Sequence, residues 1–344
     1  MCSGLSASAA WQLRAGPCGC DRRLPKGTGE MRILDAGDSE ASGGEAVTPA
    51  SGGQSEIKWP RITLVTAVYN GARYIEDTIR SIVEQGYPNL EYIIVDGGST
   101  DGTVDIIRQY EKNVTWWVSQ PDKGVYDALN TGFARASGEI MGWLNASDML
   151  HNKGLFVVGS VFAGLPEVEW ITGRPTKFSP AGMTVKVWPV PRWSRMRFLA
   201  GANKYIQQES TYWRRQLWEK AGGRLSTEFR AEGDFELWVR FFRHARLHSV
   251  DAFIAGYRAH EGALSSSNME MYDGTCNEIA DRELRSLSGA RGAKVFRRIS
   301  RLVKPIPKVR GLWQRAAMRA LYGLPGPDWP PVIEHGVEGW EIRK

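Results

Sequence analysis

Residues 61–102 read RITLVTAVYNGARYIEDTIRSIVEQGYPNLEYIIVDGGSTDG, and this stretch decides the fold class. Ile62–Val68 is a short apolar, β-branched run that ends in a Tyr-Asn-Gly turn, which predicts a buried strand. Apolar residues then recur at three- and four-residue spacing over Ile75–Val83, which predicts an amphipathic helix. A second apolar run follows at Tyr92–Val95. Two buried strands joined by a helix predict a parallel pair in an open sheet.

The alternation of helices and strands continues after this unit. A helix from 103, a strand over 115–118, a helix over 125–136 and a strand over 139–144 complete the first half. The predicted fold class is therefore α/β, with a mixed, mainly parallel sheet flanked by helices on both faces. Further along, the patterns predict a strand at 170–173 and helices over 211–221 and 233–245.

The composition divides the chain into three parts. Residues 1–56 are rich in Gly, Ala and Ser and lack helical or strand periodicity, which predicts a disordered tail. We expect one domain over 57–268, with a ligand-binding half at 57–150 and a second half at 151–268. Residues 269–344 form a basic extension that is predicted to be helical.

Bulk properties restrict the cellular setting. The net charge of +6 suits an anionic partner but does not choose among nucleic acid, membrane and phosphorylated ligands. Four cysteines are too few and too clustered for a disulfide framework. Because the sequence contains no apolar run of about 18 residues and no signal-like apolar segment, we expect a cytoplasmic protein.

Four polar stations stand where the predicted strands end. They are the stretches TAVYN at 66–70, VDGGSTDG at 95–102, DKGVYDALN at 122–130 and WLNASD at 143–148. Ligands of open α/β sheets bind at the carboxyl ends of the strands, so these stations are expected to face one site. No Gly-x-Gly-x-x-Gly follows the first strand, which argues against a dehydrogenase. The Gly-rich, Arg-containing loop expected of a sugar nucleotidyltransferase is also missing there.

Taken together, the stations resemble the nucleotide-sugar half of the family 2 glycosyltransferases, and the likeness covers roughly residues 61–265. The resemblance implies a GT-A (Rossmann-like) fold and an inverting, nucleotide-sugar-dependent transferase. It also implies that residues at the strand ends bind the donor, namely Thr66, Val68, Tyr69, Asn70, Asp96, Gly98, Ser99, Lys123, Asp127, Asn130 and Asn145. Lys123 precedes a predicted helix N-terminus, where backbone N–H groups favour anions such as a diphosphate.

The same resemblance implies a divalent metal, Mn²⁺ or Mg²⁺, at the fourth station. In the family an acidic pair commonly follows Leu-Asn-Ala, but here Ser147 stands at the first of the two positions. Asp148 therefore remains as the candidate ligand, with His260 as a second candidate that could equally be a structural histidine. The departure at Ser147 puts the metal affinity in doubt.

An inverting transfer needs a carboxylate to accept the proton of the attacking hydroxyl. By resemblance to the family's acidic motif, Asp234 is the predicted base and Glu232 the second choice; a helix-capping role for Asp234 is the alternative. The resemblance also implies that Gln208 and Trp213, together with Glu232, lie on the acceptor side. A catalytically inactive nucleotide-sugar-binding module is the alternative function, which the presence of both Asp148 and Asp234 disfavours.

Every charged residue from Arg285 to Arg319 is Arg or Lys, interleaved with apolar residues. A basic amphipathic helix of this kind can lie on an anionic membrane surface, and a helix packed on the domain fits the pattern equally well. Nucleic acid is the less favoured partner. The expected partners are thus a nucleotide-diphosphate sugar, a glycan or lipid-linked acceptor, and the inner face of the plasma membrane. The resemblance implies a UDP-sugar, since UDP-linked donors are the commonest in the family.

Overall fold

The computed structural model describes residues 58–201, 205–260, 269–302 and 330–343, with a few more between 312 and 320. The chain divides into two units, 1–54 and 55–344, and everything below concerns the second. The tail predicted over 1–56 lies outside the described residues.

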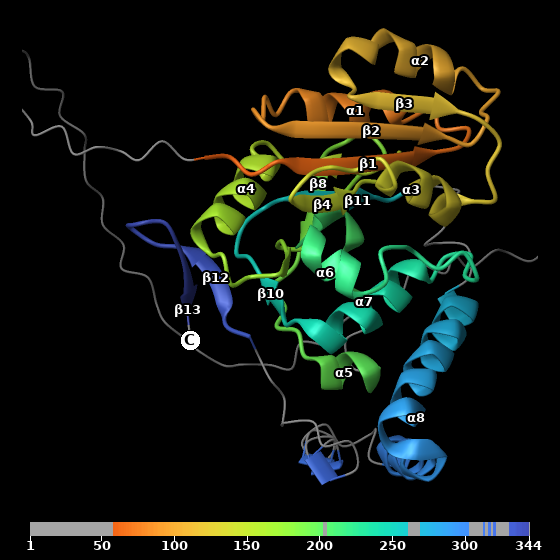
Figure 1. Cartoon of the computed structure of the whole chain (residues 1–344), viewed down its shortest axis with the longest axis vertical. Helices are drawn as coiled ribbons and strands as arrows, with labels where there is room; N and C mark the ends of the chain where they lie inside the picture. The colour runs from red at the N-terminus through yellow and green to blue at the C-terminus, as the bar shows by residue number, and fades with distance from the viewer. Residues whose placement is uncertain are drawn as a thin grey trace, which may run out of the picture. The chain divides into compact units, whose positions relative to one another are not determined.

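The first half of the domain alternates strands and helices as predicted. The elements are β1 (Ile62–Val68), α1 (Ile75–Val83), β2 (Leu90–Asp96), α2 (Thr103–Gln109), η1 (Glu111–Asn113), β3 (Trp116–Ser119), α3 (Val125–Phe133) and β4 (Ile140–Trp143). β1 pairs in parallel with both β2 and β4, and β2 pairs in parallel with β3. The carboxyl ends of these strands therefore meet at one edge (Figure 1).

The second half completes the sheet with strands of both directions. Its elements are β5 (Met149–Leu150), α4 (Gly154–Gly164), β6 (Trp170–Thr172), β7 (Thr176–Phe178), β8 (Thr184–Val187), α5 (Arg195–Leu199), η2 (Gln208–Ser210), β9 (Thr211–Arg214), α6 (Arg215–Lys220), α7 (Gly233–His244), β10 (Leu247–Ser249), β11 (Ala255–Arg258), α8 (Met269–Leu302), β12 (Val332–His335) and β13 (Trp340–Arg343). The central sheet has the order β10-β6-β9-β4-β1-β2-β3, and β9 runs antiparallel to both its neighbours. A second sheet has the order β5-β11-β7-β8. The mixed, mainly parallel α/β fold is confirmed.

One predicted helix is wrong in its first part. Thr211–Arg214 is strand β9, and only Arg215–Lys220 is helical. Thr, Tyr and Trp at 211–213 favour extended backbone, and pairing with β4 and β6 on both sides satisfies the backbone groups of β9.

The two faces of the central sheet are covered by separate apolar clusters. Along β1, Val65 and Ala67 face one cluster, whereas Leu64 and Val68 face the other, as the two-residue period of a strand requires. The first cluster is aromatic: the indoles of Trp143 and Trp238 stack with centroids 5.7 Å apart, and Trp170, Trp213, Trp218, Phe133 and Phe241 surround them. This cluster fixes β4, β9 and α7, which carry candidate site residues.

A C-terminal hairpin, β12–β13, packs on the edge of the domain next to α4 and β10 (Figure 1). Ile333 is fully buried, and its carbonyl accepts a hydrogen bond of 2.8 Å from the Asp251 N–H. The indole of Trp340 donates to Ser160 Oγ at 2.7 Å. The extension is thus helical in α8 but ends in strands, which its basic composition did not predict.

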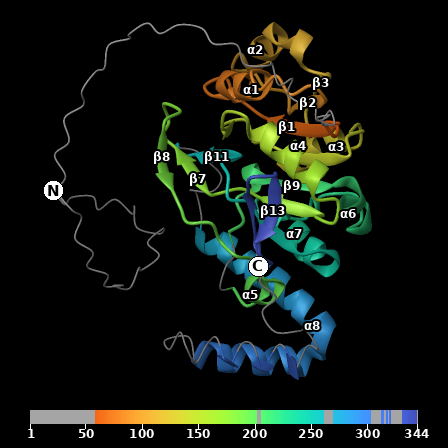
Figure 2. The ribbon, with the colours of Figure 1, turned by 90° about the vertical axis from the view of Figure 1, so that its left-hand side faces the viewer.

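Helix α8 packs against α5 and α7, as the view of Figure 2 shows from the side. Its apolar face carries Cys276, Ile279, Ala280 and Leu284, which join the aromatic cluster. Beside them, the buried carboxylate of Glu283 forms ion pairs with Arg195 of α5 (2.8 Å) and Arg243 of α7. Burial raises the pKa of Glu283, but the hydrogen bonds and charges of the two arginines outweigh it and hold that pKa below its usual value.

Glu283→Gln is expected to lower the free energy of unfolding by about 2 kcal/mol, because two guanidinium groups lose a charged acceptor that is itself buried. The measurement is urea unfolding near neutral pH. Arg282→Gln on the same helix is the control, since its pair with Glu228 is exposed and should contribute less than about 0.5 kcal/mol. Equal losses in the two variants would contradict the role of Glu283.

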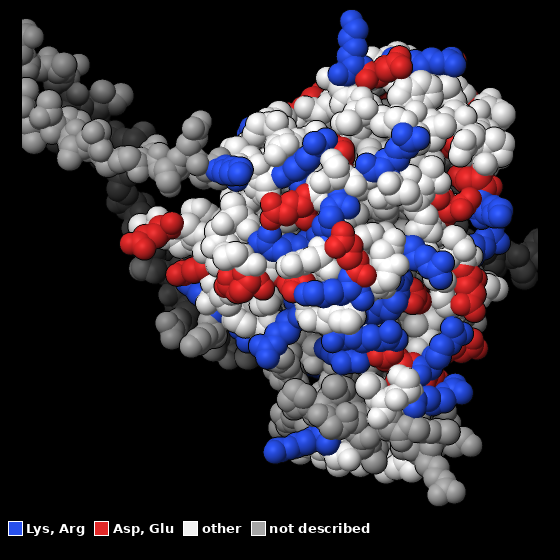
Figure 3. Space-filling view, in the orientation of Figure 1, with Lys and Arg blue, Asp and Glu red and all other residues white. Residues whose placement is uncertain are grey.

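Charge is spread over the surface of this part of the molecule. Figure 3 shows Lys and Arg side chains interspersed with Asp and Glu on the face of Figure 1. In the described part of the chain, no helix has the length and apolar character needed to cross a bilayer.

Candidate active site

The loops that follow β1 and β2 are hydrogen-bonded to each other. The backbone N–H of Asn70 donates to Ser99 Oγ at 2.7 Å, and the Thr100 N–H donates to Asn70 Oδ1 at 2.9 Å. Asn70 has a φ of 49°, a left-handed conformation that Asn tolerates better than most residues. The two expected donor-binding residues Asn70 and Ser99 therefore lie side by side.

Asp96 anchors the second loop from beneath. Its fully buried carboxylate accepts hydrogen bonds from the N–H groups of Gly98 (3.1 Å) and Ser99 (2.9 Å) and from Ser119 Oγ (2.6 Å). The Ser99 hydroxyl also donates to it. Asp96 thus fixes the shape of the loop, and it is Gly98 and Ser99 that are partly exposed at its surface.

Two residues expected to bind the donor point into the core instead. Thr66 is fully buried and its Oγ1 lies 3.2 Å from Tyr92 Oη, which donates to it. Val68 is 4% exposed and packs in the second apolar cluster. Both side chains of β1 face that cluster because they share its two-residue period, which corrects the expectation for their side chains. Tyr69, next in the chain, is 67% exposed and free to contact a ligand.

The third station is the tight entry to α3. The Gly124 N–H donates to Asp122 Oδ1 at 2.7 Å, and the Lys123 N–H donates to Asp127 Oδ2 at 3.1 Å. A Cβ at Gly97 would lie 2.7 Å from the Asp122 carboxylate, so the Asp122 side chain could keep this position only beside a glycine. Asp122 and Asp127 therefore order the turn, and the Lys123 side chain is exposed beside it.

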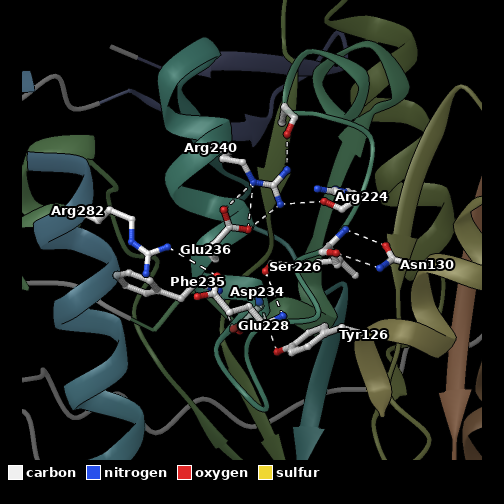
Figure 4. A network of polar contacts seen from close by, with 12 residues as sticks. Tyr126, Asn130, Arg224, Ser226, Glu228, Asp234, Phe235, Glu236, Arg240 and Arg282 are labelled. Atoms are coloured by element: carbon white, nitrogen blue, oxygen red, sulfur yellow. Dashed lines mark hydrogen bonds and ion pairs between the residues drawn. The ribbon is translucent and has the colours of Figure 1, made fainter. Parts of the chain in front are cut away.

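Asn130 joins the two halves of the domain. Its amide donates to the Leu225 carbonyl at 2.9 Å and accepts from the Leu225 N–H at 2.8 Å, a pair visible in Figure 4. This pair gives Asn130 a structural role, and the expected donor contact stays a prediction for its second N–H and its remaining oxygen lone pair.

The fourth station connects three of the predicted residues. Asn145 Nδ2 donates to Asp148 Oδ2 at 3.1 Å and to Gln208 Oε1 at 2.9 Å. Gln208 in turn donates to the Trp143 carbonyl at the end of β4. Gln208 is thus buried behind the fourth station, where it orients Asn145.

Asp148 is almost fully buried at the end of the fourth station. It is 5% exposed, and its Oδ1 accepts a hydrogen bond of 3.0 Å from the Arg258 N–H of β11. Burial raises the pKa of Asp148 to about 6, against the opposing effects of its hydrogen bonds and of the His260 charge. His260 packs on the Tyr74 ring with centroids 4.6 Å apart. Because the charge of His260 acts on Asp148, the two predicted metal ligands lie within electrostatic range of each other.

These two residues suit a divalent cation only as part of its coordination sphere. A carboxylate and an imidazole are acceptable ligands for Mn²⁺, and a buried carboxylate gains most from a nearby cation. Among the residues that the structure describes, no three His, Cys, Asp or Glu side chains come together as a complete site. The remaining ligands would have to be oxygens of a bound diphosphate and water.

Asp234 lies in the first turn of α7, half-buried, between α3 and α8 (Figure 4). Its N–H donates to Tyr126 Oη at 3.4 Å, and its Oδ1 accepts from the Phe235 N–H at 2.7 Å. Gly233 permits this approach, because a Cβ there would lie 2.7 Å from the Tyr126 ring. Burial raises the pKa of Asp234 to about 7, and the charge of Glu232 adds to the effect.

Glu232, the second choice for the base, is buried directly before α7, and its Oε2 accepts a hydrogen bond from the Ala231 N–H at 3.1 Å.

Trp213 is fully buried between Trp143, Trp218 and Trp238, so its side chain does not face the acceptor side as expected. The strand β9 is buried on both faces, and its sequence does not reveal which side chain faces a ligand.

Glu209 links the two acidic positions and was not among the predicted site residues. It is 5% exposed, and burial raises its pKa well above the usual value; the charges of Asp148 and Asp234 raise it further. Asp148 and Asp234 therefore both lie within electrostatic range of Glu209. Glu209 stands in the polar stretch Gln207–Ser210 directly before β9, and a carboxylate among these amides is the signal that could have revealed it.

Comparison with known proteins identifies the family of this chain. The family model described as "Glycosyl transferase family 2" matches residues 63–156. An uncharacterized glycosyltransferase of Mycobacterium tuberculosis is 30% identical over 187 residues, which cover 53% of this chain and 68% of the relative. The chain belongs to glycosyltransferase family 2. All four stations lie within the matched residues.

Two further relatives extend the comparison of this family 2 glycosyltransferase. A poly-beta-1,6-N-acetyl-D-glucosamine synthase of Staphylococcus epidermidis is 28% identical over 169 residues, 47% of this chain and 41% of the synthase. The crystal structure of S. aureus TarS 1-349 in complex with UDP-GlcNAc has a TM-score of 0.55 at 15% identity, over 76% of this chain and 81% of that one. The GT-A fold expected from the sequence is confirmed.

Proposed function

We propose that this family 2 glycosyltransferase transfers a sugar, with inversion, from a UDP-sugar to a hydroxyl of a glycan or glycolipid acceptor in cell-envelope or surface polysaccharide biosynthesis. The observation that carries the proposal is Asp234, a half-buried carboxylate in the first turn of α7 whose pKa burial raises to about 7. Its charge and that of Asp148 both act on the buried Glu209, so both carboxylates lie within electrostatic range of that residue. A base is most effective when its pKa lies near the working pH.

In the proposed reaction, Asp234 accepts the proton of the acceptor hydroxyl. The hydroxyl oxygen forms a bond to the anomeric carbon from the side opposite the diphosphate, and the bond from that carbon to the diphosphate oxygen breaks. The electron pair leaves with UDP, so one bond forms, one breaks and one proton moves to Asp234. Attack from the opposite side inverts the anomeric configuration.

The donor is proposed to bind over the first three stations. Tyr69 offers an exposed ring for the base, and the Asn70–Ser99 pair offers polar groups for the base and ribose. Lys123, exposed at the entry to α3, is positioned for the diphosphate. Support for UDP comes from the TarS complexes with UDP-GlcNAc and with UDP, which share the fold.

The proposed cofactor is Mn²⁺ or Mg²⁺, held by Asp148 and His260 on the protein side. When bound, such an ion would neutralise charge on the leaving diphosphate. Asn145 orients Asp148, since it donates to the carboxylate while Gln208 holds its amide. Ser147 at the preceding position leaves Asp148 as the single carboxylate of the motif.

The acceptor and the location are proposed from a named relative and from the basic C-terminal segment. The Staphylococcus epidermidis relative is named as a synthase of an extended N-acetylglucosamine polymer, which supports a glycan acceptor. The basic residues between Arg285 and Arg319 support contact with an anionic membrane surface at the inner face of the plasma membrane. Most side chains of that segment lie outside the described residues.

A thermal-shift screen tests the donor assignment. UDP and UDP-sugars are expected to raise the melting temperature, because a ligand present at 100 times its Kd stabilises the folded state by about 2.7 kcal/mol. Mn²⁺ should enlarge the shift for the nucleotides and have a smaller effect alone. A larger shift with GDP or another nucleotide than with any uridine nucleotide would contradict UDP, and an unchanged shift with Mn²⁺ would contradict the metal.

A further inference from the structure

Helix α8 supplies a hydroxyl group to the predicted base. Tyr272 Oη donates to Asp234 Oδ1 at 3.4 Å, and the same oxygen accepts the Phe235 N–H at 2.7 Å. Two donors on Oδ1 leave Oδ2 as the oxygen available to an incoming hydroxyl. We propose that Tyr272 is a positioning residue for Asp234, so that helix α8, which lies outside the residues matched by the family model, completes the active site.

The position of Tyr272 is itself fixed by its surroundings. Its ring stacks on that of Tyr205, with centroids 6.1 Å apart and an interplanar angle of 27°. The Tyr205 hydroxyl donates to Asp273 Oδ1 at 2.6 Å, so Tyr205 contacts both Tyr272 and the next residue on α8. Three turns further along, the ion pairs of Glu283 with Arg195 and Arg243 hold the helix on α5 and α7. The phenol is therefore delivered by a helix with a defined position.

The 3.4 Å separation is long for a hydrogen bond between oxygen atoms, and such contacts are often long before substrate binds. Phe235 and Tyr272 both lower the pKa of Asp234, because each stabilises the charged carboxylate. Burial and the charge of Glu232 act in the opposite direction. Tyr126 from α3 and Glu209 from η2 are the other titratable groups that interact with Asp234.

The inference rests on the proposed function, since it assigns a role relative to Asp234 as the base. Tyr272→Phe in the full-length chain is expected to lower kcat about fivefold, the effect of one lost hydrogen bond. The KM for the donor should not change. Since the lost bond favours the charged carboxylate, the acid limb of the pH–kcat profile should move from about 7 to higher pH.

Thr275→Ala is the matched control on α8, one turn after Tyr272, because its hydroxyl bonds back to the Met271 carbonyl. It should keep the kcat and the pH limb of the wild type. If Tyr272→Phe also keeps both while Asp234→Asn is inactive, the inference on Tyr272 is wrong and the proposed base stands. If Asp234→Asn retains turnover, the proposed base itself fails, whatever Tyr272→Phe does.

Discussion

Asp234→Asn is expected to lower kcat about 10³-fold, while the melting-temperature shift caused by UDP stays close to that of the wild type. The amide cannot accept a proton from the acceptor, and general bases contribute between about 10² and 10⁴ in rate. Asn keeps the shape of Asp, and its carbonyl oxygen can still accept the hydrogen bond of the Phe235 N–H. Sugar transfer measured as UDP release, beside a thermal shift with UDP, separates the two effects.

The control for this variant lies two residues further along the same helix. Glu236 is paired with Arg240 at 2.7 Å and does not contact Asp234 through any described hydrogen bond, as Figure 4 shows. Glu236→Gln should retain kcat per folded molecule. Turnover by Asp234→Asn within tenfold of the wild type would show that another group accepts the proton, and Glu232 would then be tested next.

Trp213→Ala is expected to destabilise the protein by about 4 kcal/mol, which is a large part of the stability of a typical domain. The indole is fully buried, with ring centroids 5.5 Å from Trp143 and 5.9 Å from Trp238, so its removal leaves a cavity in the aromatic cluster. Urea unfolding followed by circular dichroism measures the loss. Trp117→Ala is the comparison, because its half-buried ring should cost clearly less.

The same position also separates a structural role from an acceptor-binding role. Trp213→Phe keeps an apolar ring in the cluster and should leave the KM for the acceptor unchanged. If that KM rose while stability hardly changed, Trp213 would belong on the acceptor side, as the family resemblance implied.

The first half of the fold could be predicted because its signals are local. Buried runs such as Ile62–Val68 end at turn residues, and the helices between them have apolar stripes at helical spacing. Parallel pairing then brings the strand ends together without further information. The helix prediction for 211–214 was wrong because this stretch lies between the short helices η2 and α6. Its strand conformation is set by pairing with β4 and β6, which are distant in the sequence.

The site was predicted less completely, for reasons that particular residues make clear. In a strand buried on both faces, apolar sequence does not show where Thr66 and Val68 point. Asn130 pairs with Leu225, a partner 95 residues away that no local pattern identifies. Tyr272 reaches Asp234 only because α8 folds back onto α7. The residues that could be found were those at strand ends and helix starts.

The interlocked loops after β1 and β2 have a consequence for the energetics of donor recognition. Asp96 and Asn70 hold the backbone of 97–100 in place by the protein's own hydrogen bonds. A segment already ordered in the free state loses little conformational entropy when a ligand arrives, so more of the contact energy remains as affinity. A nucleotide that binds to these loops should therefore meet a preformed surface, and any slow conformational change on binding should occur in other parts of the molecule.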